Sequence, residues 1–263
     1  MNDSPSRRRD RDEGYVDRAK DRSRDAAHRG RDAVDRATEV MHDKIAEAKP
    51  RLRGWLHSGS LPVMTAAFAV LIVLSPTTET RVGSSVFAAG AILLFTVSGI
   101  YHRGTWSPRT WAFLRRFDHA NIFIFIAATY TPFAFLYLDG AALWTLLGIV
   151  WTCALVGTAF KIAWPGAPRW TSMLYVAMGW LVVFFIPQMR DGASAFPTWV
   201  NVSALSLIAA GGIMYTVGAV VYALKRPDPA PEWFGFHEVF HALTVAAFVC
   251  QYTAVSIATY SLR

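Results

Sequence analysis

Seven apolar stretches, each long enough to cross a lipid bilayer, are the feature that most constrains how this chain can fold. A transmembrane helix needs about 20 consecutive, mostly apolar residues. Proline and glycine interrupt the apolar pattern between stretches, as at Pro76, Gly140 and Pro197, which is typical of loops. The predicted membrane-spanning helices are roughly Trp55–Ser75, Val82–His102, Asp118–Leu138, Ala141–Ala163, Trp170–Gln188, Trp199–Ala223 and Phe236–Tyr260. The expected fold class is therefore an all-α membrane protein, a seven-transmembrane helix bundle.

The distribution of charge separates this bundle from the rest of the chain. Residues 1–53 hold 15 of the 26 Lys and Arg and 12 of the 19 Asp and Glu, whereas the remaining 210 residues hold only 11 basic and 7 acidic side chains. Soluble domains carry about 25% charged residues, so these 210 residues cannot form one large soluble domain. Neither part has the dense basic patch of a nucleic-acid-binding protein, and no nucleic-acid partner is expected. We predict a charged polar tail over residues 1–50 and a seven-helix transmembrane domain over 51–263.

The tail itself has little capacity to fold. Residues 1–30 contain too few apolar side chains to offset the loss of chain entropy and are predicted to be disordered. Residues 31–49 show a weak helical period that Pro50 ends. A helix lying on the membrane surface and a solvated helix of mixed charge both fit this period, and the thin apolar stripe favours the second.

Basic residues in alternate loops predict the orientation of the bundle. Cytoplasmic loops of membrane proteins carry an excess of Lys and Arg. With the N-terminus in the cytoplasm and the C-terminus outside, the outer side keeps only Arg81, Arg190 and Arg263. The inner side then holds Lys49, Arg51, Arg53, Arg103, Arg109, Arg115, Arg116, Lys161, Arg169, Lys225 and Arg226. We therefore expect a multi-pass protein of the cytoplasmic (plasma) membrane in this orientation.

A few ionisable residues lie within the apolar stretches, all at one end of the expected bundle. His102 ends the second predicted helix, Asp118 and His119 open the third, and His237 and His241 lie near the start of the seventh. In the orientation given above, all five fall at cytoplasmic helix ends. Ionisable groups are costly inside a membrane and mark functional sites by default.

The spacing of these residues predicts a metal site. His237 and His241 are four residues apart, so their rings share one face of a helix. With His102 they provide three imidazoles, and three histidines with one open position form a typical catalytic zinc site. Asp118 is then expected to hold or deprotonate a water as general base, and Ser98 to donate to a substrate carbonyl or a developing oxyanion. The alternative is that these histidines are interfacial residues that hydrogen-bond helix ends.

Glu238 completes a literal HExxH pattern with the two histidines of the seventh helix. In zinc proteases the glutamate of this pattern is the general base. On an ideal helix, however, Glu238 points about 100° away from His237. We expect its side chain to face a neighbouring helix or loop rather than the metal.

Three motifs in this order resemble the hemolysin III-like family. They are the SGIYH sequence at residues 98–102, the segment DHANIFIFIAATYTPF at 118–133 and the HEVFH sequence at 237–241. The resemblance covers about residues 51–263 and leaves out the tail. The family is similar to the progestin and adipoQ receptors and, more distantly, to the alkaline ceramidases.

The resemblance implies a zinc ion on the cytoplasmic side, with His102, His237 and His241 as its ligands. It further implies that Asp118 contacts the zinc through water and that Ser98 lies near this water. His119 matches another family position and is expected behind the ligands, orienting Asp118 or one of the histidines. His57 lies where relatives often carry a polar residue, and we interpret it as an interfacial histidine.

Three functions compete on these observations. The first is a zinc-dependent hydrolase of lipid amides or esters, as in ceramidase-like relatives, acting on a fatty-acyl or sphingolipid-like membrane lipid. The second is a receptor-like or membrane-homeostasis protein with a structural or sensory zinc. The third is a cytolytic, pore-forming protein, which the pattern disfavours because a water-filled pore needs polar side chains along its whole length. The sequence predicts neither the substrate, the oligomeric state nor the role of the tail.

Overall fold

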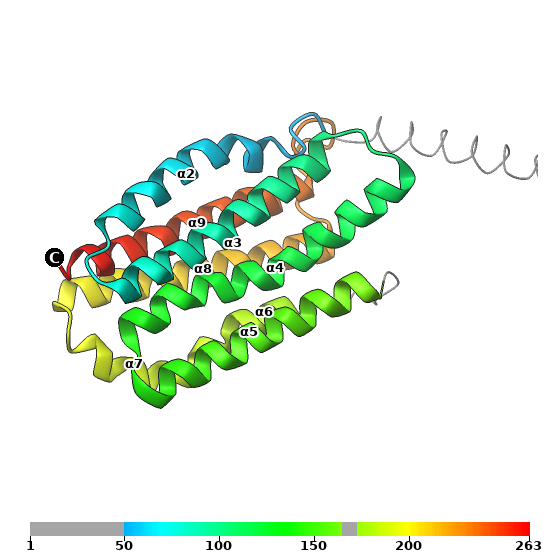
Figure 1. Cartoon of the computed structure of the whole chain (residues 1–263). Coiled ribbons are helices and arrows are strands. Elements are labelled where there is room, and N and C mark those ends of the chain that lie inside the picture. Colours follow the sequence, from blue (N-terminus) through cyan, green and yellow to red (C-terminus); the bar gives the residue numbers. More distant parts are fainter. Residues whose placement is uncertain (1–49, 165–172) are drawn as a thin grey trace, which may run out of the picture. The chain divides into compact units, whose positions relative to one another are not determined.

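A computed structural model describes residues 50–164 and 173–263 of the chain, and residues 1–49 of the predicted tail lie outside this part. The described residues form helices joined by turns, with no strand among them (Figure 1). The elements are α2 (Trp55–Leu74), α3 (Thr78–Arg103), α4 (Pro108–Tyr137), α5 (Gly140–Ala163), α6 (Met173–Gly179), the 3₁₀ helix η2 (Trp180–Phe185), α7 (Ile186–Ala193), α8 (Thr198–Leu224) and α9 (Phe236–Tyr260). With α6, η2 and α7 taken together as one span, seven helical spans are long and apolar enough to cross a membrane. The predicted all-α, seven-helix fold class is confirmed.

Local capping signals move the starts of two helices away from the predicted positions. The side chain of Thr77 accepts a hydrogen bond from the Thr80 backbone N–H, so α3 begins at Thr78 rather than Val82. Ser107 caps α4 in the same way, and Pro108 occupies its first turn. The prediction that Asp118 and His119 open this helix is therefore wrong, because α4 begins ten residues earlier. Hydropathy detects only the apolar part of a helix and misses the arginine-rich turns that extend it.

The fifth span is irregular and also differs from its prediction. It runs from Met173 to Ala193, past the predicted end at Gln188, and the turn follows at Ser194. The predicted start at Trp170 lies outside the described residues. The hydroxyl of Tyr130 in α4 supports the irregular middle. It accepts a hydrogen bond from the Val182 N–H at 3.0 Å and lies 2.7 Å from the Gly179 carbonyl oxygen, to which it donates. A side chain from α4 thus partners backbone groups where the regular helical pattern is broken.

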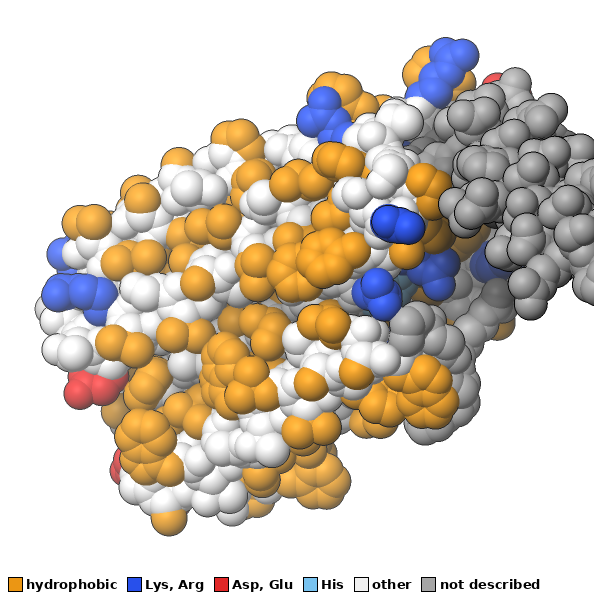
Figure 2. All heavy atoms as spheres, turned by 45° about the vertical axis from the view of Figure 1, so that its right-hand side comes forward, with side chains coloured by type: hydrophobic (Ala, Val, Ile, Leu, Met, Phe, Trp, Pro, Cys, Tyr) orange, Lys and Arg blue, Asp and Glu red, His pale blue; other side chains and the backbone are white. Residues whose placement is uncertain are grey.

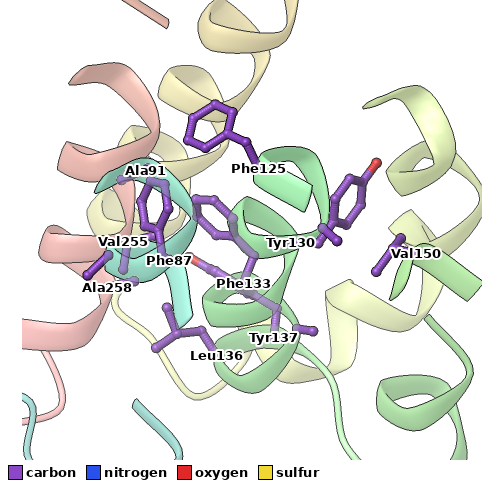
Figure 3. Close-up of a cluster of buried hydrophobic side chains, with 14 of the residues drawn as sticks. Phe87, Ala91, Phe125, Tyr130, Phe133, Leu136, Tyr137, Val150, Val255 and Ala258 are labelled. Carbon is purple, nitrogen blue, oxygen red and sulfur yellow. The ribbon is translucent and has the colours of Figure 1, made fainter. Parts of the chain in front are cut away.

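The core of the bundle lies between α3, α4 and α9, which are its most buried spans (Figure 1). Aromatic and aliphatic side chains from these helices meet at its centre, among them Phe87, Phe125, Phe133 and Val255 (Figure 3). Phe68 from α2 packs edge-on against Phe87, with ring centroids 5.0 Å apart. The middle of the bundle is therefore filled by apolar side chains.

The outer surface between the two ends of the bundle is largely apolar. Figure 2 shows hydrophobic side chains over the sides of the helices, with Lys and Arg side chains gathered toward the two ends. Trp144, Val156 and Phe184 are among the large apolar residues that are mostly exposed. Such a surface is stable in contact with lipid, and together with the seven spans it identifies a multi-pass integral membrane protein.

Glycines allow α3 and α4 to pack closely. A Cβ atom built on Gly90 of α3 would lie 2.4 Å from the Cβ of Ala128 in α4, which is far inside van der Waals contact. We expect Gly90→Ala to lower the free energy of unfolding in detergent by about 1–3 kcal/mol through overpacking. Thermal melting or graded SDS unfolding measures this change. The control is Gly148→Ala in α5, where nothing lies within 4 Å; an equally large loss there would contradict the packing argument.

Alternate loops meet at the same end of the bundle. The turn between α3 and α4 and the segment between α8 and α9 lie at one end, and the C-terminus lies at the other (Figure 1). We call the end at which α3 finishes and α9 begins the histidine end. It is the end that the loop charges predict to be cytoplasmic.

Candidate metal centre

Three histidines from two helices converge at the histidine end. His102 comes from the last turn of α3, and His237 and His241 come from the first two turns of α9. Each offers a ligand atom within 4.8 Å of the other two. His102 and His241 are buried and His237 is partly buried. The structure thus brings together the three residues that sequence spacing selected, and they can hold one metal ion.

The separation of two ring nitrogens tests whether these histidines fit zinc. The Nε2 atoms of His102 and His237 lie 3.2 Å apart. Two imidazole nitrogens at 2.0–2.1 Å from one tetrahedral Zn²⁺ would lie roughly 3.3–3.4 Å apart, which is close to the separation found. Neutral imidazole is also a ligand type that suits zinc. The donor set and its spacing therefore fit a divalent metal ion such as zinc.

Asp118 and Ser98 lie beside the histidine cluster. Asp118 Oδ2 is 3.7 Å from His102 Nε2, and the Ser98 side chain is within hydrogen-bonding reach of Asp118. Ser98 precedes His102 by one turn of α3, and both side chains are buried. The longer α4 therefore still delivers Asp118 to the cluster from its third turn. The roles of Asp118 and Ser98 in catalysis stay predictions.

The side chain of Tyr222 lies between His119 and the histidine cluster. Its Nδ1 lies 2.6 Å from the carbonyl oxygen of Arg115, one turn earlier in α4. Its Nε2 lies 3.5 Å from the hydroxyl of Tyr222, whose ring centroid is 5.6 Å from that of His237. This arrangement connects His119 with a candidate ligand and leaves its expected orienting role a prediction.

Glu238 points away from the metal ligands, as its offset on the helix predicts. Its Oε1 accepts a hydrogen bond of 2.5 Å from Arg53 Nε, and its Oε2 accepts one of 2.9 Å from the backbone N–H of Gly235. Through these two contacts the buried carboxylate caps the start of α9 and forms an ion pair with Arg53. The HExxH glutamate is therefore a structural residue here, in contrast to its place in zinc proteases.

The chain just before α2 is tied to the segment just before α9. The N–H groups of Arg51 and Leu52 donate to the carbonyl oxygens of Glu232 and Trp233 at 2.9 and 3.2 Å. Gly54 then adopts a φ of +79°, and a Cβ at this position would lie 2.8 Å from the Cβ of His102. This close approach brings the start of α2 against the metal centre.

Breaking the Arg53–Glu238 pair is expected to destabilise the histidine end. Arg53→Met leaves the buried Glu238 carboxylate without its cation, so we expect a loss of about 3 kcal/mol in the free energy of unfolding. Arg51→Met is the matched control, because Arg51 is exposed and lies over the Trp233 ring at 4.4 Å. Its loss should stay near or below about 1 kcal/mol. Equal losses of stability in the two variants on thermal melting would show that the Arg53–Glu238 ion pair contributes no more to stability than the exposed Arg51.

His57 makes a contact that sequence reasoning did not predict. We interpreted it as interfacial, but it is buried, and its ring stacks on that of His241 with centroids 4.0 Å apart and planes 3° apart. No spacing rule relates a residue in α2 to one in α9. The only signal in the sequence was a histidine close to the start of a membrane-spanning stretch.

Comparison with known proteins decides the family. Residues 45–252 match the model of the "Haemolysin-III related" family. The chain belongs to the haemolysin III-related family. Its three sequence motifs, and the resemblance they carry, are thereby confirmed at the level of the family.

Individual members and relatives of the haemolysin III-related family are similar to this chain over most of its length. "Hemolysin-3" of Bacillus cereus is 29% identical over 195 residues, covering 73% of this chain and 83% of that protein. "Hemolysin-3 homolog" of Bacillus subtilis (strain 168) is 34% identical over 159 residues, covering 59% and 70%. "Monocyte to macrophage differentiation factor" of Homo sapiens is 23% identical over 195 residues, covering 71% and 74%.

Proposed function

We propose that this haemolysin III-related protein is a zinc-dependent hydrolase of lipid amides or esters in the cytoplasmic membrane. The observation that carries the proposal is the convergence of three imidazoles, a carboxylate and a hydroxyl at one end of an apolar bundle. His102, His237 and His241 would hold the zinc. The three histidines would leave one coordination position open, which is the pattern of catalytic rather than structural zinc sites.

The other two residues have complementary roles in this proposal. A bound zinc supplies a water that is nucleophilic at neutral pH and polarises a carbonyl group. The Asp118 carboxylate, 3.7 Å from a ligand nitrogen, takes the proton from the attacking water as general base and returns it to the leaving amine or alcohol as the C–N or C–O bond breaks. The Ser98 hydroxyl, next to Asp118, donates a hydrogen bond to the carbonyl oxygen as negative charge develops on it.

The surroundings of the site favour a lipid substrate. The histidines lie at the ends of membrane-spanning helices, and the surface of these helices is apolar along their length. An acyl chain can stay in the bilayer while its amide or ester group reaches the level of the histidines. A water-soluble substrate would gain nothing from this placement.

A second candidate is a receptor-like or membrane-homeostasis protein in which the metal is structural or sensory. The burial of His102 and His241 favours it, because buried ligands limit the access of water and substrate to a bound metal. This candidate predicts that a chelator lowers the melting temperature in detergent although no lipid is turned over. A pore-forming function, suggested by the name of the Bacillus relatives, is disfavoured by the apolar core that fills the middle of the bundle.

The test is hydrolysis by purified protein loaded with zinc. Short-chain ceramide and an acyl ester of similar chain length serve as probes, and the released fatty acid is measured by mass spectrometry. We expect release that a chelator abolishes and added zinc restores. If the protein holds a full complement of zinc but releases no fatty acid from either probe, the proposed hydrolase activity is refuted. The candidate with a structural or sensory metal is then retained.

A further inference from the structure

His57 is a buried polar group whose contacts the proposed chemistry does not use. The residue is 3% exposed, and within the described part of the chain neither ring nitrogen has a hydrogen-bond partner. Buried polar groups in proteins nearly always have a partner, and leaving one unpaired costs free energy. An orphaned imidazole next to a cluster of three others calls for a specific explanation.

Packing alone does not explain an imidazole at this position. One face of the His57 ring covers His241, and the Phe95 ring lies near it with centroids 4.6 Å apart. A phenylalanine would give the same flat contact between these aromatic groups without two unpaired nitrogens. The surroundings of His57 therefore favour a phenyl ring on packing grounds, and the nitrogens must serve another purpose.

The geometry indicates that His57 would lie beside the ligands of a metal ion rather than be one of them. The rings of His57 and His241 are parallel within 3° and their centroids are 4.0 Å apart. An ion bound by His241 would consequently be poorly placed for coordination by a His57 nitrogen, because the two rings are stacked rather than directed at one point. His57 also does not belong to the group whose ligand atoms lie within 4.8 Å of one another. Its two ring nitrogens, which have no partner among the described residues, are therefore available to a ligand that would share the metal with the three histidines.

The backbone around His57 holds this arrangement in place. A Cβ on Gly99 of α3 would lie 2.6 Å from Oγ of Ser58, so α2 and α3 come unusually close directly after His57. Three residues before it, Gly54 lies against His102. The first turn of α2 is thus fixed against the helix that carries one of the ligands.

We infer that His57 is a binding residue of the metal centre, which hydrogen-bonds through a ring nitrogen to an oxygen atom of the ligand that shares the metal with His102, His237 and His241. The ligand class is a carbonyl, carboxylate or hydroxamate group. The inference rests on the metal site of the proposed function and extends it by a fourth helix, since α2 then contributes to substrate binding.

The test uses cobalt-substituted protein in detergent, in which visible absorption reports both metal binding and a further ligand. Acetohydroxamate is the probe. In His57→Phe we expect cobalt affinity to stay within about threefold of wild type, while the Kd of acetohydroxamate rises about tenfold through loss of one hydrogen bond. Phe95→Leu is the matched control. It removes the other ring beside His57 and leaves the imidazole, so both affinities should stay near those of wild type.

Three results would overturn the inference, and they are distinguishable. Equal acetohydroxamate affinities in wild type and His57→Phe would show that His57 only packs. A loss of cobalt in His57→Phe would make His57 a support of the metal ligands instead. Failure of wild type to bind cobalt would overturn the metal site and this inference together.

A second pair of variants keeps the test independent of one substitution. His57→Gln retains a donor and an acceptor, and His57→Leu retains neither. We expect acetohydroxamate to bind to the glutamine variant about tenfold more tightly than to the leucine variant. Equal affinities in this pair also overturn the inference.

Discussion

Replacing His237 and His241 together by alanine is expected to reduce the zinc content of the purified protein from about one ion per chain to less than about a tenth. The two residues supply two of the three imidazoles that meet at the histidine end. His102 alone cannot hold the ion, because a single imidazole in a protein binds zinc weakly compared with a chelating set. Elemental analysis of protein purified in detergent without added metal measures the change.

A neighbouring pair on the same helix provides the control for this loss. Phe236 and Phe240 are also four residues apart, each directly before one of the histidines, and both are partly buried. Phe236→Ala with Phe240→Ala therefore removes two rings at the same level of α9 without touching a ligand atom. We expect this variant to retain its zinc. The wild-type protein should hold about one zinc ion per chain. A wild-type content below about half an ion per chain would contradict the ligand assignment.

The starts and ends of most helices followed from apolar length and from proline and glycine. The predicted Phe236–Tyr260 helix coincides with α9, and α5 ends at Ala163 as predicted. The start of α4 did not follow, because the ten residues before Asp118 are rich in arginine and look like a loop. Only the Ser107 cap followed by Pro108 marks the true start. Hydropathy identifies only the apolar part of a helix, which is long enough to cross the membrane, and does not detect polar turns that extend the helix further.

The candidate site was predictable where its residues follow a local rule. His237 and His241 share a helix face by spacing, and loop charge places His102 at the same end of the bundle. The stacking of His57 on His241 was not predictable, since it depends on how closely α2 approaches its neighbours at Gly54 and Gly99. Contacts of this kind join residues far apart in the chain, and no periodicity in one sequence encodes them.

Asp118→Asn is expected to lower the rate of lipid hydrolysis by about 10²–10⁴-fold while zinc is retained. Asparagine has nearly the same shape as aspartate, so the contacts with Ser98 and His102 are largely kept. It cannot take up the proton of the attacking water, and the general base is lost. Initial rates of fatty-acid release, normalised to zinc content, measure the effect and separate it from loss of the metal.

The same substitution at the opposite end of α4 serves as the control. Asp139 is exposed, follows the C-terminal end of α4 and makes no side-chain cap for α5, so Asp139→Asn should leave the rate unchanged. Together the two variants distinguish proton transfer from a general effect of negative charge on the protein. If Asp118→Asn keeps both its zinc and its full rate, Asp118 is not the base, and proton removal must be assigned to another group at the histidine end.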